Sequence, residues 1–283
     1  MIIVKNLNYT YPGNHSETLS GINFNIEKGE IFGFLGPNGA GKSTTQKVLT
    51  RLLRNYLGEV RILGKDLHNW HSEFYDHIGV GFELPNHYAK LTAMENLKFF
   101  AAFYNKPVKN FSALLARVGL EKDANKKIES YSKGMKVRLN FVRAIMHDPD
   151  ILFLDEPTTG LDPSNARIIK DIILELKKQG KTIFLTTHNM HDAEELCDRV
   201  SFIANGSLRV TDSPRNLKLI NGQRRVRVDY GNQSTETKEF DLDSIGSNRE
   251  FMELIRKEHI ASIHSLEAGL DEIFIKTTGT RLA

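Results

Sequence analysis

The residues with the clearest chemistry lie in one short segment near the N-terminus. It reads Gly36-Pro37-Asn38-Gly39-Ala40-Gly41-Lys42-Ser43-Thr44. This is the spacing of a phosphate-binding loop, whose glycines let successive backbone N–H groups point at phosphate oxygens. A helix that begins here adds the positive end of its dipole. We therefore predict that this segment binds ATP, with Lys42 on the β- and γ-phosphates and Ser43 as a ligand of Mg²⁺.

Two carboxylates form a second candidate site. Asp155 and Glu156 directly follow the apolar run of residues 151–154, which predicts a buried strand. Such a strand ends at the edge of an α/β sheet where ligands bind. Asp155 is expected to hold Mg²⁺ through a water, and Glu156 to act as general base on the attacking water. Acidic strand ends are common, so the prediction depends on the phosphate-binding loop.

Two further positions are ambiguous on their residues alone. His188 follows an expected strand and could hydrogen-bond a γ-phosphate, but a histidine there is more often a surface or capping residue. Ser132 precedes a helix that carries arginines, and a capped helix N-terminus can bind an anion. A simple cap with a solvated basic face is the favoured interpretation of Ser132.

The elements that must position these residues alternate between strands and helices. Residues 22–26 alternate apolar and polar as a half-buried strand does, and Val48, Leu49, Leu52 and Leu53 have helical spacing. The remaining patterns predict strands at 30–35, 78–82, 150–154 and 181–186, mainly helix at 93–147, a helix at 164–178, and a hairpin at 200–210 that turns at Asn205-Gly206.

This alternation predicts an α/β fold with a largely parallel sheet. We expect a main domain over residues 1–220 with a helical part inserted at about 84–148. The composition changes near Asn221. Residues 221–283 are expected to form a small accessory α+β domain with two alternating strands, a helix at 249–257, a strand at 262–266 and a final short helix.

Composition narrows the function classes. The 283 residues are 40% hydrophobic and 26% charged, and the net charge of +3 is too small to indicate nucleic-acid binding. The single cysteine, Cys197, excludes an internal disulfide and is expected to pack on a helix. No run approaches the ~18 apolar residues of a membrane span, and no signal peptide is evident. A membrane role would therefore need a partner chain.

Taken in order, these segments resemble the nucleotide-binding subunit of an ABC transporter over about residues 1–220. The family's signature motif, Leu-Ser-Gly-Gly-Gln in its usual form, corresponds to Tyr131-Ser132-Lys133-Gly134-Met135. Of the motif residues, only Ser132 and Gly134 are kept. The resemblance makes His188 the switch histidine and Asp162 part of the D-loop, which contacts the opposite subunit. It also places Tyr11 where an aromatic side chain stacks on adenine.

The resemblance implies a P-loop NTPase with a mixed sheet, an antiparallel β subdomain, the inserted helical part and the C-terminal α+β appendage. Such subunits hydrolyse ATP as head-to-tail dimers, in which Ser132 of one copy covers the γ-phosphate held by Lys42 of the other. The dimer can be a homodimer or a heterodimer. An integral membrane permease docks in a groove at about residues 83–96, which places the chain at the cytoplasmic face of the cell membrane.

Glu83 is the main departure from the family, which usually has glutamine at this position. By resemblance this side chain contacts Mg²⁺ and the attacking water. Glutamate can still ligate Mg²⁺, and it adds a negative charge beside Asp155 and Glu156. We expect this charge to raise the metal dependence of the reaction or to slow turnover.

Two function classes stay open within the family: the energising subunit of a membrane transporter, and a soluble ABC ATPase that acts on ribosomes or DNA. The single cassette and the absence of sustained heptads favour the transporter. Residues 189–198 and 266–274 resemble exporters of drugs, antibiotics or lipid-linked glycans, which favours export.

Two remaining groups of residues have weaker signals. Arg224, Arg225 and Arg227 could contact lipid head groups or a partner, but a solvated strand face is the simpler interpretation. A set of histidines lacks companions at metal-ligand spacing and is expected in surface loops. These are His68, His71, His77 and His87.

Overall fold

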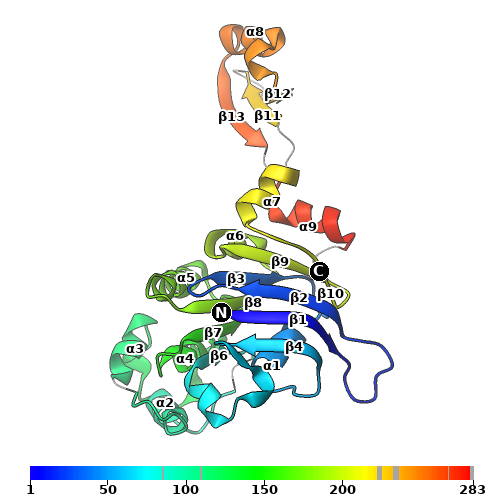
Figure 1. The fold of residues 1–283 in the computed structure, drawn as a ribbon. Helices are drawn as coiled ribbons and strands as arrows, with labels where there is room; N and C mark the ends of the chain where they lie inside the picture. Colours follow the sequence, from blue (N-terminus) through cyan, green and yellow to red (C-terminus); the bar gives the residue numbers. More distant parts are fainter. Residues whose placement is uncertain (85, 109, 222–224, 232–235, 267, 281–283) are drawn as a thin grey trace.

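The structure, a computed structural model, describes residues 1–84, 86–108, 110–221, 225–231, 236–266 and 268–280 (Figure 1). The strands are β1 (Ile2–Tyr9), β2 (Leu19–Ile26), β3 (Ile31–Leu35), β4 (Leu57–Ile62), β5 (Lys65–Asp66), β6 (Ile78–Gly81), β7 (Ile151–Asp155), β8 (Thr182–Thr187), β9 (Arg199–Ala204), β10 (Ser207–Asp212), β11 (Arg225–Tyr230), β12 (Glu236–Asp241) and β13 (Ile260–Leu266). The helices are α1 (Lys42–Leu49), α2 (Ala93–Ala101), α3 (Phe111–Arg117), α4 (Lys133–Ile145), α5 (Pro163–Lys178), α6 (Met190–Leu196), α7 (Pro214–Asn221), α8 (Arg249–Lys257) and α9 (Leu270–Thr278).

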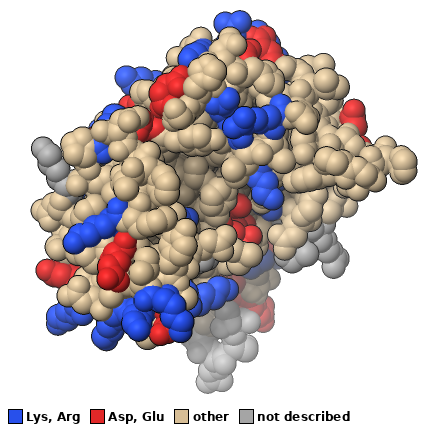
Figure 2. Space-filling view, turned by 90° about the horizontal axis from the view of Figure 1, so that it is seen from below, with Lys and Arg blue, Asp and Glu red and all other residues tan. Residues whose placement is uncertain are grey.

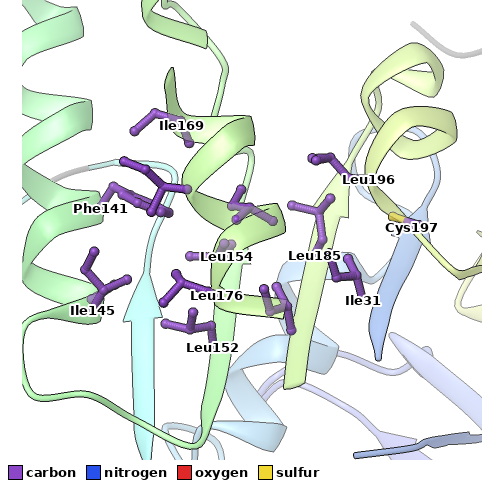
Figure 3. Close-up of a cluster of buried hydrophobic side chains, with 14 of the residues drawn as sticks. Ile31, Phe141, Ile145, Leu152, Leu154, Ile169, Leu176, Leu185, Leu196 and Cys197 are labelled. Atoms are coloured by element: carbon purple, nitrogen blue, oxygen red, sulfur yellow. The ribbon is translucent and has the colours of Figure 1, made fainter. Parts of the chain in front are cut away.

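A mixed sheet in the order β10-β9-β3-β8-β7-β6 forms the centre of the molecule. All its strands are parallel except β10, which pairs antiparallel with β9. Both faces are covered, so alternate residues of one strand enter different cores: Ile31 lies in one buried cluster and Phe32 in the other. Figure 3 shows the first cluster, where side chains of α4 and α5 pack on the sheet. The predicted α/β fold is confirmed.

The second cluster joins the central sheet to α1 and to an antiparallel sheet in the order β2-β1-β4-β5. The alternation predicted for residues 22–26 is present, with Ile22, Phe24 and Ile26 buried. The prediction that Leu52 and Leu53 continue the apolar face of α1 is wrong. The helix ends at Leu49, and Leu52 is 56% exposed because the chain turns away through Arg51 at a φ of 61°.

The expected helical segment contains α2, α3 and α4. A capping box starts α2, in which Thr92 accepts from the backbone N–H of Glu95 and the Glu95 carboxylate accepts from the backbone N–H of Thr92. Leu97, Leu115 and Leu139, one from each helix, belong to the same buried cluster as the central sheet. The helical segment therefore shares the core of the sheet instead of forming a separate one.

The predicted hairpin is present as β9 and β10. Its turn residues Asn205 and Gly206 both have positive φ, at 50° and 72°, which is the conformation that a tight two-residue turn demands. A Cβ on Gly206 would also come within 2.5 Å of the backbone oxygen of Thr18. Glycine is therefore favoured at position 206 both by the backbone conformation and by the lack of space for a side chain.

The C-terminal region forms a small antiparallel sheet, β12-β11-β13, with α8 against it, and Figure 1 shows it standing clear of the central sheet. The final helix, α9, was expected with this accessory domain but packs on the main one. Leu270, Ile273 and Phe274 lie in the cluster of the central sheet, and the rings of Phe274 and Phe202 are 5.1 Å apart. Within the described ranges, no helix has the length and apolarity needed to cross a membrane.

Candidate nucleotide site

The phosphate-binding loop joins β3 to α1, as its sequence predicts. A Cβ on Gly36 would lie 2.3 Å from the backbone oxygen of Ile203, and Gly41 has a φ of 111°, so neither position accommodates a larger residue without strain. Tyr11, Thr18 and residues of the loop between Pro37 and Thr44 line a cavity of about 280 Å³. The loop therefore borders an open space into which phosphates can enter.

Lys42 lies at the first position of α1 and is buried. Its ammonium donates to the backbone oxygens of Gly36 at 2.6 Å and Pro37 at 3.1 Å. Burial lowers the pKa of Lys42, while the nearby charges of Glu156 and Asp155 act in the opposite direction. A cation whose hydrogen bonds to described residues go to two carbonyl oxygens can exchange these contacts for phosphate oxygens.

Ser43 and Asp155 come together from α1 and β7. The Ser43 hydroxyl donates to Asp155 at 3.2 Å, and the Thr186 hydroxyl donates to the other carboxylate oxygen. Burial raises the pKa of Asp155, because the charged form loses its hydration. Mg²⁺ prefers oxygen ligands. Ser43 and Asp155, the two residues predicted to hold Mg²⁺ together, therefore lie next to each other at one edge of the sheet.

Glu156 is buried and accepts hydrogen bonds from four donors. The imidazole Nδ1 of His188 lies 2.6 Å from Glu156, and the His188 backbone N–H lies 2.9 Å away. The hydroxyls of Thr159 and Thr187 each donate to it at 3.0 Å. Glu156 also has a φ of 49°, a strained value for a residue with a side chain. Strain and saturated bonding at one carboxylate are typical of a functional position.

Thr159 and Thr187 were not among the predicted site residues, and neither was Thr186. The only signal in the sequence is that each is a threonine next to a motif residue, which is too common to identify a role. Thr187 is fully buried, and its hydroxyl also accepts from the backbone N–H of Asn189. It therefore joins Glu156 to the segment that leads into α6.

Glu83 lies where the prediction places it, beside the two carboxylates. It is exposed, just after β6, and with Asp155 and Glu156 it lines a small hollow at the sheet edge. Its charge is close enough to raise the pKa of Lys42, though less than Glu156 and Asp155 do. The structure thus gathers three acidic side chains opposite one lysine.

Tyr11 lies at the entrance to the cavity. Its hydroxyl is 3.2 Å from the Thr44 hydroxyl, and its ring meets Tyr9 edge-on with centroids 5.0 Å apart. The ring is thus fixed beside the loop, which is compatible with stacking against a base.

The signature and D-loop residues lie apart from the phosphate-binding loop. Ser132 caps α4, accepting from the backbone N–H of Met135 at 3.2 Å, and Asp162 caps α5. A Cβ on Gly134 would touch Leu161 at 3.4 Å, and one on Gly160 would meet Lys133 at 3.1 Å. The two motifs contact each other, and within the described residues no hydrogen bond joins them to residues 36–44.

Several other residues named in the sequence analysis contact side chains outside the nucleotide site. His77 pairs with Asp150 at 2.7 Å, and His68 stacks on Tyr56. Arg225 and Arg227 each lie 3.3 Å from Glu239, while Arg224 is outside the described residues. Cys197 is buried at the end of α6, in contact range of Gly33, and burial raises the pKa of its thiol.

Comparison with known proteins decides the family. Residues 19–159 match the family model described as ABC transporter. The fluoroquinolones export ATP-binding protein of Mycobacterium tuberculosis (strain CDC 1551 / Oshkosh) is 49% identical over 284 residues, covering 100% of this chain and 94% of that protein. This chain belongs to the ABC transporter ATP-binding proteins. The bacitracin transport ATP-binding protein of Bacillus licheniformis is 38% identical to this ABC protein over 208 residues, covering 73% and 68% of the two.

Solved structures agree with the family. An ATP-binding cassette, solved as a dimer in a post-hydrolysis state bound to ADP and Pi, superposes with a TM-score of 0.69 at 27% identity and covers 75% of this chain and 98% of that chain. An ATP-binding subunit of an ABC transporter gives 0.70 at 28% identity, covering 78% and 92%. The predictions of ATP binding, ATP hydrolysis and a transporter subunit are confirmed. Residues 224–267 also match the fluoroquinolone efflux ABC transporter C-terminal domain.

Proposed function

We propose that this ABC ATPase drives the export of fluoroquinolone-class drugs through a membrane permease. The observation that carries the proposal is similarity along the whole chain, since the C-terminal residues 224–267 match a domain described for fluoroquinolone efflux. A cassette alone is common to transporters of unlike cargo. The C-terminal match therefore carries the information about cargo class.

For the reaction, we propose the roles that the sequence predicted. Lys42 moves from the carbonyls of the loop to the phosphates, Ser43 and Asp155 hold Mg²⁺, and Glu156 takes a proton from the attacking water. Mg²⁺ supplies neutralising charge at the β- and γ-phosphates when it is bound. The His188 imidazole bonded to Glu156 must change partners before the carboxylate can accept a proton. Glu83 adds a third carboxylate at the metal side of the site.

The separation of Ser132 from the phosphate-binding loop supports a second cassette as a partner. The cap of α4 presents backbone N–H groups to solvent in this subunit, and a head-to-tail dimer would bring them to the γ-phosphate of the other copy. Asp162 and Ser132 would both lie at that interface. ATP would then close the dimer, and hydrolysis would reopen it.

The permease is proposed to dock on the helical segment, at the cytoplasmic face of the membrane. A cavity of about 560 Å³ opens there, between β6, α2 and α4. Six of the side chains that line this cavity define what we call the aromatic groove. They are Tyr75, His87, Tyr88, Phe100, Tyr104 and Arg143.

The experiment is drug accumulation in a fluoroquinolone-sensitive bacterium that expresses this chain with the membrane protein that co-purifies with it. We expect cellular norfloxacin to fall several-fold relative to cells with an empty vector. Cells carrying Lys42→Ala in place of the wild-type chain are the matched control and should accumulate as much as vector cells. An ATPase-active complex that leaves norfloxacin accumulation unchanged would contradict the proposed cargo.

A further inference from the structure

The C-terminal sheet has two edge strands that differ in charge. Its strand order is β12-β11-β13, and Figure 1 shows β13 along the outer side of this sheet. Four of the six residues of β12 are charged, and charge on an edge strand discourages other strands from pairing with it. The sequence of β13, Ile-Ala-Ser-Ile-His-Ser-Leu, contains no Lys, Arg, Asp, Glu or Pro. The β13 edge therefore lacks the protection that the β12 edge has.

The backbone of β13 is paired on one side. Its residues from Ile260 to Leu266 pair antiparallel with β11. On its other side, none of the strands in the described ranges pairs with it. Alternate N–H and C=O groups of an edge strand point away from the sheet, where they can bond to a further strand.

Ile263 adds an apolar side chain at this edge. It lies opposite Val228 of β11, on the sheet face that α8 covers. Val228 is fully buried, whereas Ile263 is 50% exposed. The apolar face of the sheet therefore ends at β13 with a large side chain in contact with water. A strand added beside β13 would cover this side chain and remove apolar surface from water.

The sequence of β13 fits a copy of itself. Ile263 is the middle residue of seven, so a two-fold axis beside it would place Ile263 opposite Ile263 of a second copy, and Ser262 opposite His264. The Ser262 hydroxyl donates to Asp229 at 2.7 Å, and its oxygen can still accept a hydrogen bond. An imidazole N–H of His264 can donate it. The central pairs are then apolar or hydrogen-bonded, and no like charges meet.

We propose that β13 of one chain pairs antiparallel with β13 of a second copy of this chain, so that two C-terminal sheets become one continuous sheet. The ATPase pair is then a homodimer, held by a contact outside the nucleotide sites. The choice of partner rests on the proposed cassette dimer, which already brings two such chains together. The pairing of β13 adds a second, separate interface.

The β13 edge and the proposed permease surface lie at different ends of the molecule. Figure 2 is seen from below Figure 1, from the end that carries α2, and the C-terminal sheet lies behind that end (Figures 1 and 2). A permease on the helical segment and a second copy at β13 would therefore not compete for one surface.

The test is disulfide cross-linking of the purified full-length chain without nucleotide. Directly opposite residues of antiparallel strands have Cα atoms about 4.5–5.5 Å apart, which a disulfide can span. Ile263→Cys should therefore form a disulfide-linked dimer under copper-phenanthroline oxidation. Thr237→Cys, exposed on the β12 edge, is the matched control, and Ile263→Cys should link at least about tenfold faster. The native Cys197 is buried, so wild type should not link.

The register has its own test, which also serves if Ile263→Cys does not fold. Chains with Ser262→Cys and chains with His264→Cys carry different tags and are mixed. The proposed pairing puts these two positions opposite each other, so mixed dimers should form faster than either dimer of identical chains.

A charge at the centre of the strand should separate the chains. Ile263→Lys would place two ammonium groups opposite each other, and we expect self-association without nucleotide, measured by sedimentation velocity, to weaken at least about tenfold. Ile263→Val keeps the apolar contact and should associate like wild type. In the Glu156→Gln background, Ile263→Lys should leave the ATP-dependent dimer in place, because that dimer uses the cassettes.

The outcomes separate this inference from the proposed function. If Ile263→Cys links no faster than Thr237→Cys, if identical chains link faster than mixed ones, or if Ile263→Lys sediments like wild type, the inference is overturned and the proposed function stands. If Ile263→Cys in membranes links to a different protein in place of its own copy, the occupant is wrong and the inference fails. If Ile263→Cys links as expected but Glu156→Gln forms no dimer with ATP, the cassette dimer fails and the β13 contact stands.

Discussion

In the nucleotide site, Lys42, Asp155 and Glu156 are buried and each has hydrogen-bond partners from this chain. In the aromatic groove, no described carboxylate pairs with the half-buried Arg143, and none of the described groups bonds to Nδ1 of His87. The two regions thus differ in how many of their hydrogen-bond partners this chain supplies. Glu156 is held by four hydrogen bonds from its own subunit, whereas the groove contains polar groups that the described residues leave unpaired. Substitutions in the two regions should therefore fail in different assays.

Apart from the loss of Glu156, the largest effect is expected at Lys42. Lys42→Ala removes the buried cation of the loop and leaves the phosphates without its charge, so hydrolysis should fall on the order of 1,000-fold. ATP binding, measured by titration with a fluorescent ATP analogue, should weaken together with the rate. If binding and rate both stay within a few-fold of wild type, the phosphate-binding role of the loop lysine is wrong.

A smaller loss is expected at Thr187. Thr187→Val keeps the shape of a buried side chain but removes one donor to Glu156 and the acceptor for Asn189. A hydrogen bond to a charged group contributes about 1.5–3 kcal/mol, so kcat should fall about 10- to 100-fold with KM little changed. Thr187→Ser restores the hydroxyl and should recover most of the rate. Equal rates for Val and Ser would show that the hydroxyl does not position Glu156.

The next prediction concerns the effect of Glu83 on the Mg²⁺ dependence of the rate. Glu83→Gln removes one of three carboxylates at the sheet edge, so less Mg²⁺ should be needed to reach half-maximal rate, by a factor within about tenfold. Titrating Mg²⁺ at fixed ATP measures this. An unchanged Mg²⁺ dependence together with an unchanged rate would mean that the extra charge has no role in the reaction.

The smallest effect concerns His87 and stability. Burial lowers its pKa from 6.5 to about 4, so the unfolded chain binds more protons than the folded chain between these values. Its contribution to stability is therefore present above pH 6.5 and is lost as the pH falls toward 4. His87→Gln should reduce this slope, measured by urea unfolding at several pH values, while leaving the contribution of His147. If the free energy of unfolding of the variant changes with pH as much as that of wild type, His87 is hydrated in the folded chain and this explanation is wrong.

The sequence predicted those parts of the structure that depend on local chemistry. The phosphate-binding loop and the turn at Asn205-Gly206 need glycine for backbone reasons, and the helix over residues 249–257 is present as α8 with the same ends. The end of α1 was missed because Leu52 continues the helical spacing although it is exposed. Whether an apolar residue with helical spacing is buried depends on tertiary packing, which periodicity does not show.

In the site, residue type and motif order predicted Lys42, Ser43, Asp155 and Glu156, and the family resemblance added His188. The structure brings these residues together. The hydroxyl partners Thr159, Thr186 and Thr187 could not be predicted, because a threonine beside a motif residue is ordinary. Arg143 was seen only as part of a basic helix. That none of the carboxylates in the described part of the chain pairs with it is a property of three-dimensional packing, and no spacing in the sequence reveals it.

The central claim is that Glu156, held by His188 and the two threonines, performs the chemistry of an ATPase. The most direct measurement compares hydrolysis and ATP-dependent dimerisation of Glu156→Gln with wild type. The amide keeps the size of the side chain but cannot accept a proton, so turnover should fall about 100- to 10,000-fold while ATP still binds and a stable dimer appears on size-exclusion chromatography. Near-normal turnover of Glu156→Gln would contradict this account.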